Sequence, residues 1–299
     1  PIIERVLAQA CVRELVVVDD GSSDGPSAQL DRWAKEDPRV RLVRHPVNRG
    51  KGAAIRSGLP LVTSPVVVIQ DADLEYDPAD YSSMLAVLLG GENPPEPFSH
   101  CAPEQAGRDA RPRASKPSRR EEEERPRLAG LPTSDPPVHG EADVVYGSRF
   151  LRGGNVTWKW HRAANWVLTL ICNACTGLNL TDAHTCLKML PTALLRALAL
   201  EEERFGFCPE VTAKLARIPG LRIVEVPVGY RPRRRGQGKK IGFRDGVRAV
   251  YCYVHYGLLG RGSGGLPHSV VATGGWVGKV DAKPAADHGA TAITEGERS

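Results

Sequence analysis

The stretch VVVIQDADLEYDP, residues 66–78, decides the fold class that we predict for this chain. It opens with a continuous apolar run, Val66 to Ile69, that is rich in β-branched residues. Such a run is typical of a strand that is buried on both faces, as in a parallel sheet. Open parallel sheets bind their ligands just beyond the carboxyl ends of the strands. The acidic residues that follow this run are therefore expected at a ligand site.

Asp71 and Asp73 follow the run with one residue between them. Two carboxylates so close together repel each other unless a cation lies between them. Mg²⁺ and Mn²⁺ bind hard oxygen ligands, usually one or two carboxylates together with substrate phosphates. We interpret this DxD motif as a Mg²⁺ or Mn²⁺ site that holds a diphosphate. An acidic loop in solvent is the alternative.

Strands and helices are expected to alternate up to residue 90. The expected helices span 2–10, 26–35, 53–59 and 78–89, and the expected strands span 14–18, 40–43 and 66–69. This alternation predicts right-handed βαβ units and a mostly parallel sheet. The strand at 14–18 also ends in carboxylates, Asp19 and Asp20. An acidic residue after an early strand commonly binds a ribose or base in nucleotide-binding folds, so we expect both acidic pairs at one edge of the sheet.

The pattern breaks between residues 91 and 140, which are rich in proline and in charges of both signs. Such a segment buries too little apolar surface to offset its ordering entropy, and we predict a disordered insertion. A docking arm for a partner is the alternative. Order is expected to resume with strands at 142–146 and 221–226 and helices at 158–175, 191–200, 209–217 and 241–258. The Gly/Ala-rich tail from residue 259 is predicted to be disordered.

Composition narrows the class of protein. The 299 residues are 41% hydrophobic and 25% charged, as in globular proteins. The net charge of +5 comes from local clusters, and we predict no nucleic-acid partner. The seven scattered cysteines favour a reducing compartment with free thiols, and Cys172 and Cys175 are expected to pack in a core rather than bind zinc. We find no signal peptide. The uncharged run 163–181 is too polar for a transmembrane helix, and we predict no transmembrane span.

Seven motifs together resemble glycosyltransferase family 2. They are VVVDDGSSDG (16–25), NRGKGAAIRSG (48–58), QDADLEYDP (70–78), ADVVYGSRF (142–150), TGLNLTDAHTCLKM (176–189), RFGFCPEVTAKLAR (204–217) and GQGKKIGFRDG (236–246). Within the family they resemble the polyprenyl-phosphate sugar transferases, such as dolichyl-phosphate mannose synthase and dolichyl-phosphate glucosyltransferase. The motifs occur in family order from Ile2 to about Tyr256, with the insertion between them.

The resemblance implies a GT-A (Rossmann-like) fold. It also implies transfer of a hexose, with inversion, from a nucleotide sugar of the GDP-mannose or UDP-glucose type to polyprenyl or dolichyl phosphate. On this basis residues 1–90 are the nucleotide-sugar-binding half of the domain and residues 141–258 the acceptor half. The insertion at 91–140 and the tail at 259–299 complete the expected organisation.

The resemblance also implies roles for single residues. Asp20, with Asp19, is expected to hold the nucleoside, and Lys188 to face the phosphates. Asp71 and Asp73 are the expected metal ligands. The residues expected at the reaction itself are Asp73, Arg149 near the sugar-nucleotide, and Arg233 and Lys239 in a basic loop over the phosphates.

Three departures from the family pattern affect the expected activity. The first strand and the P-x-Y-N-E turn of the family are missing, and the chain starts within the helix that follows them. Gln237 replaces a usual Glu, and His184 replaces an acidic residue. A sheet without an inner strand has exposed edges, so reduced activity is expected. Two alternatives to the transferase therefore stay open: an inactive remnant that binds a membrane or partner, and a family 2 enzyme with another acceptor.

A lipid acceptor requires contact with a membrane surface. We predict peripheral attachment at the cytosolic face through the tryptophans at 158, 160 and 166 and the basic loop 231–240. Tryptophan favours the headgroup zone, and basic residues are attracted to anionic lipid. Core packing of the tryptophans is the alternative.

Overall fold

The apolar run at 66–71 lies near the middle of a seven-stranded sheet in the computed structural model. The structure describes residues 2–22, 27–90, 142–151, 159–232, 242–260 and 290–296. Every residue of β3 (Val66–Asp71) is buried up to Gln70, and Asp71 emerges at the end of the strand. The predicted two-sided burial of this strand is confirmed.

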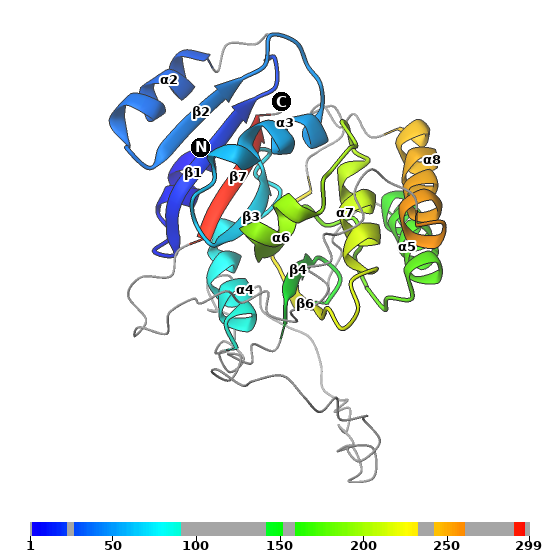
Figure 1. The fold of residues 1–299 in the computed structure, drawn as a ribbon. Helices are drawn as coiled ribbons and strands as arrows, with labels where there is room; N and C mark the ends of the chain where they lie inside the picture. The colour runs from blue at the N-terminus through cyan, green and yellow to red at the C-terminus, as the bar shows by residue number, and fades with distance from the viewer. Residues whose placement is uncertain are drawn as a thin grey trace.

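The sheet has the strand order β2-β1-β7-β3-β5-β4-β6 (Figure 1). All neighbouring pairs are parallel except those of β5, which runs antiparallel to β3 and β4. The strands are β1 Val12–Asp19, β2 Val40–Arg44, β3 Val66–Asp71, β4 Val144–Ser148, β5 Lys188–Pro191, β6 Ile223–Pro227 and β7 Ala290–Gly296. The predicted α/β class with a mostly parallel sheet is confirmed.

The helices follow the expected alternation. The α-helices are α1 Ile2–Leu7, α2 Ser27–Glu36, α3 Lys51–Gly58, α4 Tyr81–Leu88, α5 Lys159–Thr176, α6 Thr192–Ala197, α7 Phe207–Leu215 and α8 Phe243–Cys252. Short turns extend three of them, η1 Leu59–Leu61, η2 Pro78–Asp80 and the π-helical η3 Tyr253–Leu258. Asp77 caps η2 by accepting the N–H of Ala79 at 3.1 Å, because an N-terminal turn leaves donors that a side-chain oxygen can satisfy.

The short strand β5 was not expected. The segment Lys188–Pro191 begins with a charged residue and ends in proline, which local patterns do not favour for a strand. The segment forms a strand because β3 pairs with it along four residues and β4 pairs with it on its other side. Position 188 is thereby placed inside the sheet.

The C-terminal strand β7 corrects the prediction of a disordered tail. Residues 290–296 form a parallel strand between β1 and β3, with Ile293 opposite Val16 on one side and Ile69 on the other (Figure 1). The resemblance predicts a sheet that lacks an inner strand, yet the described sheet is continuous at this place. β1 and β3 are both apolar and buried, and a strand between them satisfies backbone groups that would otherwise be unpaired. The predicted insertion and the rest of the tail lie outside the described residues.

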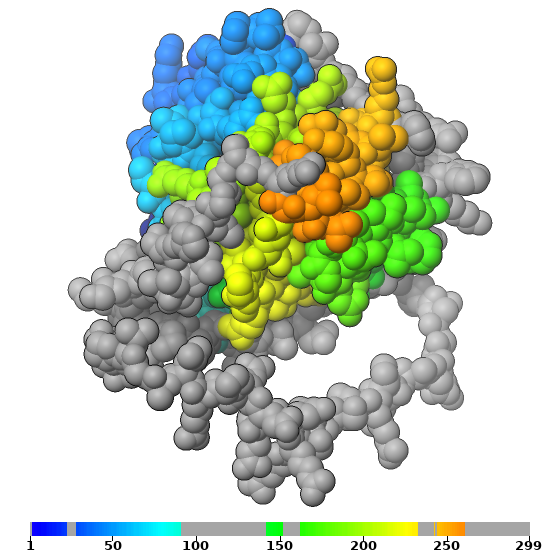
Figure 2. All heavy atoms as spheres, turned by 45° about the vertical axis from the view of Figure 1, so that its right-hand side comes forward, coloured from blue at the N-terminus to red at the C-terminus, as the bar shows by residue number. Residues whose placement is uncertain are grey.

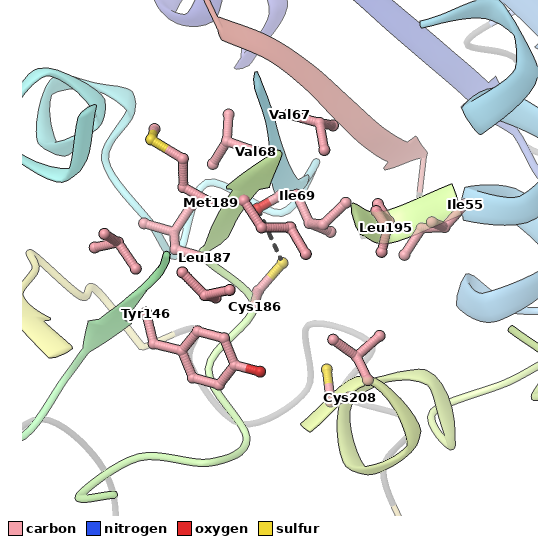
Figure 3. Close-up of a cluster of buried hydrophobic side chains, with 14 of the residues drawn as sticks. Ile55, Val67, Val68, Ile69, Tyr146, Cys186, Leu187, Met189, Leu195 and Cys208 are labelled. Carbon is pink, nitrogen blue, oxygen red and sulfur yellow. Dashed lines mark hydrogen bonds between the residues drawn. The ribbon is translucent and has the colours of Figure 1, made fainter. Parts of the chain in front are cut away.

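A core of apolar side chains supports the ends of the central strands. Figure 3 shows Val67, Val68 and Ile69 of β3 beside Met189 of β5 and Tyr146 of β4. All five are at most 1% exposed. Burying a side chain of this size contributes roughly 1.5–3 kcal/mol. This packing stabilises the strands whose ends carry the predicted site residues.

Candidate active site

Asp71, at the end of β3, forms an ion pair with Lys51 at the start of α3. Lys51 Nζ donates to Asp71 Oδ1 and lies 3.0 Å from the Sγ of Cys186. The Lys51 side chain is 6% exposed, whereas that of Asp71 is 25% exposed. Burial would lower the pKa of Lys51, but the Asp71 carboxylate outweighs it and raises that pKa well above its ordinary value. The positive charge of Lys51 therefore lies next to one predicted metal ligand.

Asp73 lies in the turn directly after β3. Its Oδ1 accepts the backbone N–H of Glu75 at 3.0 Å, and Leu74 between them has a positive φ of 60°. This turn keeps both carboxylates of the DxD motif at the carboxyl end of the strand.

The two carboxylates suit a hard divalent cation. Asp71 is 25% exposed, so its carboxylate is accessible at the end of the strand. Across the described ranges, His, Cys, Asp and Glu side chains nowhere gather in a group of three that could hold a metal. Two carboxylates completed by phosphate or water oxygens are the donor set that Mg²⁺ or Mn²⁺ prefers.

Asp20 is buried and holds the Gly-rich turn before α3. Its carboxylate accepts the N–H of Arg49 at 2.9 Å and that of Gly50 at 2.6 Å. His45 Nδ1 lies 2.6 Å from the same carboxylate, and its Nε2 lies 2.8 Å from the hydroxyl of Ser57. The sequence analysis missed His45, because no local pattern links it to Asp20. The predicted nucleoside contact of Asp20 stays a prediction, since intramolecular bonds already engage its carboxylate.

Asp19 ends β1 at the same edge of the sheet as Asp71. Its Oδ1 accepts the N–H of Ser22 at 3.0 Å. In the ladder Asp19 lies opposite Gly296, and Asp71 lies opposite Glu295. One strand, β7, therefore separates the two acidic strand ends, which corresponds to about 9.6 Å at the usual spacing of neighbouring strands. The structure brings the two predicted acidic pairs to one edge.

Arg149, which follows β4, is bound by the buried carboxylate of Asp182. Its Nε and Nη2 donate to Oδ2 and Oδ1, each at 2.6 Å, and its backbone N–H donates to Oδ2 at 3.1 Å. Burial opposes ionisation of Asp182, but the guanidinium outweighs it and lowers the pKa of that carboxyl. Sequence reasoning assigned no role to Asp182; its place in the motif TGLNLTDAHTCLKM was the available signal.

Aromatic side chains connect the Asp71 and Arg149 parts of the site. The hydroxyl of Tyr76 accepts the N–H of Cys186 at 3.2 Å, and the rings of Tyr76 and Tyr230 meet edge to face at 5.2 Å. The guanidinium of Arg149 lies 5.2 Å from the Tyr230 ring, whose hydroxyl donates to Glu75 at 2.9 Å. Both tyrosines escaped the sequence analysis.

Lys188 is placed differently from its predicted role. It is fully buried in β5, donates to the carbonyl of Ala183 at 3.0 Å and lies 3.6 Å from the centre of the Tyr146 ring. Burial lowers its pKa. Nearby, burial lowers the pKa of His184 to about 4, and Tyr253 hydrogen-bonds its Nε2 at 3.0 Å. The predicted contact of Lys188 with phosphates gains no support from this buried position and stays a prediction.

The remaining predicted site residues cannot be placed. Arg233 and Lys239, in the basic loop, lie outside the described residues, as does Gln237. Their predicted role over the phosphates stays a prediction.

Comparison with known proteins finds similar glycosyltransferases. Residues 1–93 match the family profile described as Glycosyl transferase family 2. The chain is 29% identical over 259 residues to an undecaprenyl-phosphate mannosyltransferase of Micrococcus luteus, covering 84% of this chain and 85% of that protein. It is 25% identical over 274 residues to a polyprenol monophosphomannose synthase of Mycolicibacterium smegmatis, covering 87% of this chain and 83% of that protein.

A solved structure is also similar. It is a mannosyltransferase from Pyrobaculum calidifontis in complex with GDP-Man and Mn²⁺, with 17% identity and a TM-score of 0.42, covering 85% of this chain and 64% of that one.

The predicted resemblance to family 2 and the predicted transferase class are confirmed by the match of residues 1–93 and by the similar transferases. The mostly parallel sheet agrees with the GT-A fold expected of that family. Residues 1–93 thus match family 2 glycosyltransferases, and the chain over most of its length is similar to polyprenyl-phosphate sugar transferases.

Proposed function

We propose that the chain transfers a hexose, with inversion, from a nucleotide sugar to polyprenyl or dolichyl phosphate. The observation that carries this proposal is the register of the sheet, which brings the acidic ends of β1 and β3 to one edge. A nucleotide sugar presents a nucleoside and a diphosphate, and each of these strand ends offers carboxylates that suit one of the two groups. The names of the similar transferases support a polyprenyl-phosphate acceptor and mannose as the transferred hexose.

The reaction depends on the positioning of donor and acceptor more than on a strong general base. The oxygen of a phosphate monoester is already anionic at pH 7 and can attack the anomeric carbon directly. Catalysis then depends on orienting the reactants and on neutralising the departing diphosphate. Asp71 and Asp73 would hold Mg²⁺ or Mn²⁺, which when bound supplies positive charge for that diphosphate. Arg149, which Asp182 holds in place, would orient the sugar-nucleotide from the end of β4.

A radiolabelled transfer assay tests the proposal. The protein is incubated with Mn²⁺ or Mg²⁺, a nucleotide sugar and polyprenyl phosphate, and lipid-linked sugar is extracted and counted. Product is expected with one nucleotide hexose, and Asp71→Asn should lower its rate at least tenfold, because the variant removes a negatively charged ligand of the divalent cation that neutralises the diphosphate. Glu36→Gln, on the exposed side of α2, is the matched control and should keep the rate. No lipid-linked sugar with any donor would refute the proposal.

An inactive chain that still binds membranes is the second candidate. The engagement of both Asp20 oxygens by the protein itself favours it. Calorimetry with UDP or GDP and Mn²⁺ separates the two candidates. Micromolar binding that is lost in Asp73→Ala supports the transferase, whereas a folded protein without binding supports the second candidate.

We also propose a peripheral position on the cytosolic face of a membrane. The described cysteines are all free thiols, as a reducing compartment allows. Within the described ranges, no helix combines the length and apolar character that crossing a bilayer requires.

The membrane contact that we propose is a surface on the paired helices α5 and α8–η3, which lie side by side on one face of the molecule (Figure 2). We call it the helix-pair surface. It consists of large apolar side chains that are exposed, Trp166, Val167, Leu170, Val247, Tyr251, Leu258 and Leu259. Trp166 is 64% exposed, so this tryptophan does not pack in the core. Arg162 and Arg244, both exposed, flank the apolar side chains and would suit anionic headgroups.

Liposome co-sedimentation measures this contact. The double variant Trp166→Ser with Leu170→Ser should bind anionic liposomes at least fivefold more weakly, because it removes two apolar side chains from the headgroup zone. Val47→Ser removes another exposed apolar side chain, one that is 63% exposed and outside this surface, and should bind normally.

The same assay tests the charged part of the contact. Binding should weaken between low and physiological salt, because exposed charges are screened. Replacing Arg233, Arg234 and Arg235 by Ala should weaken it further. Equal binding to neutral liposomes would contradict the electrostatic part.

A further inference from the structure

Lys51 is held in place by the backbone around it. The turn before α3 is bound on one side by Asp20, which accepts the N–H of Gly50 at 2.6 Å. On the other side Gly52 donates to the carbonyl of Arg204 at 3.2 Å. A Cβ at Gly52 would overlap the carbonyl oxygen of Glu202, so the two segments pack at backbone distance. This clamp directs the Lys51 side chain inward, toward β3.

The Lys51 ammonium is therefore held at a fixed position inside the protein. Its side chain is 6% exposed, and its Nζ has the Oδ1 of Asp71 and the Sγ of Cys186 as partners. The thiol lies in the core beside Ile69, whose carbonyl is 3.8 Å from the Sγ (Figure 3). Because Asp71 is four times as exposed as Lys51, the lysine approaches the carboxylate from the protein side.

A fixed cation at this place changes what the DxD motif can bind. It cancels one of the two carboxylate charges and repels a divalent ion that approaches Asp71 alone. It attracts a diphosphate, and a diphosphate in turn supplies negative charge for the metal. The lysine charge should thus make metal binding depend on the nucleotide.

We propose that Lys51 couples the metal to the nucleotide: it fixes Asp71 through Oδ1, and its charge keeps the divalent ion weakly bound until a nucleoside diphosphate is present. Lys51 is a positioning residue in this role, and the proposal rests on the metal site of the proposed function. Metal and nucleotide would then bind as one unit, which prevents the site from filling with metal alone.

Mn²⁺ titrations followed by electron paramagnetic resonance test this role. Free Mn²⁺ is measured with the wild-type protein, Lys51→Met and Lys51→Gln, each without nucleotide and with saturating GDP or UDP. Lys51→Gln can still donate a hydrogen bond to Asp71, which makes it the variant of choice if Met disturbs the fold. Both variants should bind Mn²⁺ at least tenfold more tightly without nucleotide, and the enhancement by nucleotide should fall at least tenfold. Lys35→Met, on α2, removes a lysine charge elsewhere and should match the wild type.

The outcomes separate this inference from the function on which it rests. Nucleotide-enhanced Mn²⁺ binding in the wild type, with the same enhancement in folded Lys51→Gln, would overturn the role of Lys51 and leave the metal site intact. Weaker Mn²⁺ binding by both variants without nucleotide would also overturn it. If the wild-type protein binds no Mn²⁺ even with GDP or UDP, the proposed metal site fails and this inference fails with it.

Discussion

Replacing Ile293 with proline is expected to lower the free energy of unfolding by about 1–3 kcal/mol, because the partner of its backbone N–H loses a hydrogen bond. Ile293 lies in β7, opposite Val16 and Ile69, so its backbone has a strand on each side. Proline lacks the N–H that a central strand uses in its ladder. For a chain of this size the loss corresponds to a drop in melting temperature of roughly 2–12 °C.

The matched control for this prediction is Ile293→Val. Valine keeps the N–H and the preference of a β-branched residue for strands, so its melting temperature should stay close to that of the wild type. Thermal unfolding followed by circular dichroism measures both variants. If the proline variant melts like the valine variant, residues 290–296 do not form a central strand in solution.

Replacing Asp182 with asparagine is expected to cost about 3–5 kcal/mol of stability at pH 7. The substitution leaves the Arg149 guanidinium without its counter-charge, although the side chain of that arginine is only 12% exposed. Losing one partner of a buried ion pair is costly because the other charge stays desolvated. The double variant Asp182→Asn with Arg149→Met removes both charges and should recover part of the loss. Denaturant titrations of the wild type, both single variants and the double variant measure this coupling.

The pH dependence of this pair has a definite sign. Arg149 lowers the pKa of Asp182 in the folded protein, while an Asp in an unfolded chain titrates near about 3.9. The stabilisation is therefore fully present above that value and is lost as the pH falls through the lower folded pKa. The stability difference between the wild type and Asp182→Asn should be constant from pH 5 to 7 and should shrink toward pH 3. A difference that grows in acid would contradict the assignment.

The sequence by itself determined the parts that depend on neighbouring residues. The apolar run Val66 to Ile69 forms the predicted strand, and Asp77 caps the turn that follows. The alternation of strands and helices up to residue 90 predicted the parallel pairing. It also predicted that Asp19 and Asp71 lie at the same edge of the sheet. These features follow from periodicity and capping over a few residues, which a single sequence displays.

Only the tertiary structure decided which distant groups meet. Lys51 pairs with Asp71 across 20 positions, and Arg149 pairs with Asp182 across 33. Strands β5 and β7 have weak local signals, and they form because neighbouring strands offer unpaired backbone groups and apolar cover. Such contacts join segments that are distant in the sequence, and the residue pattern within one segment does not predict them. For this reason the predicted site residues were recognisable in the sequence, but the charges and strands that hold them in place were not.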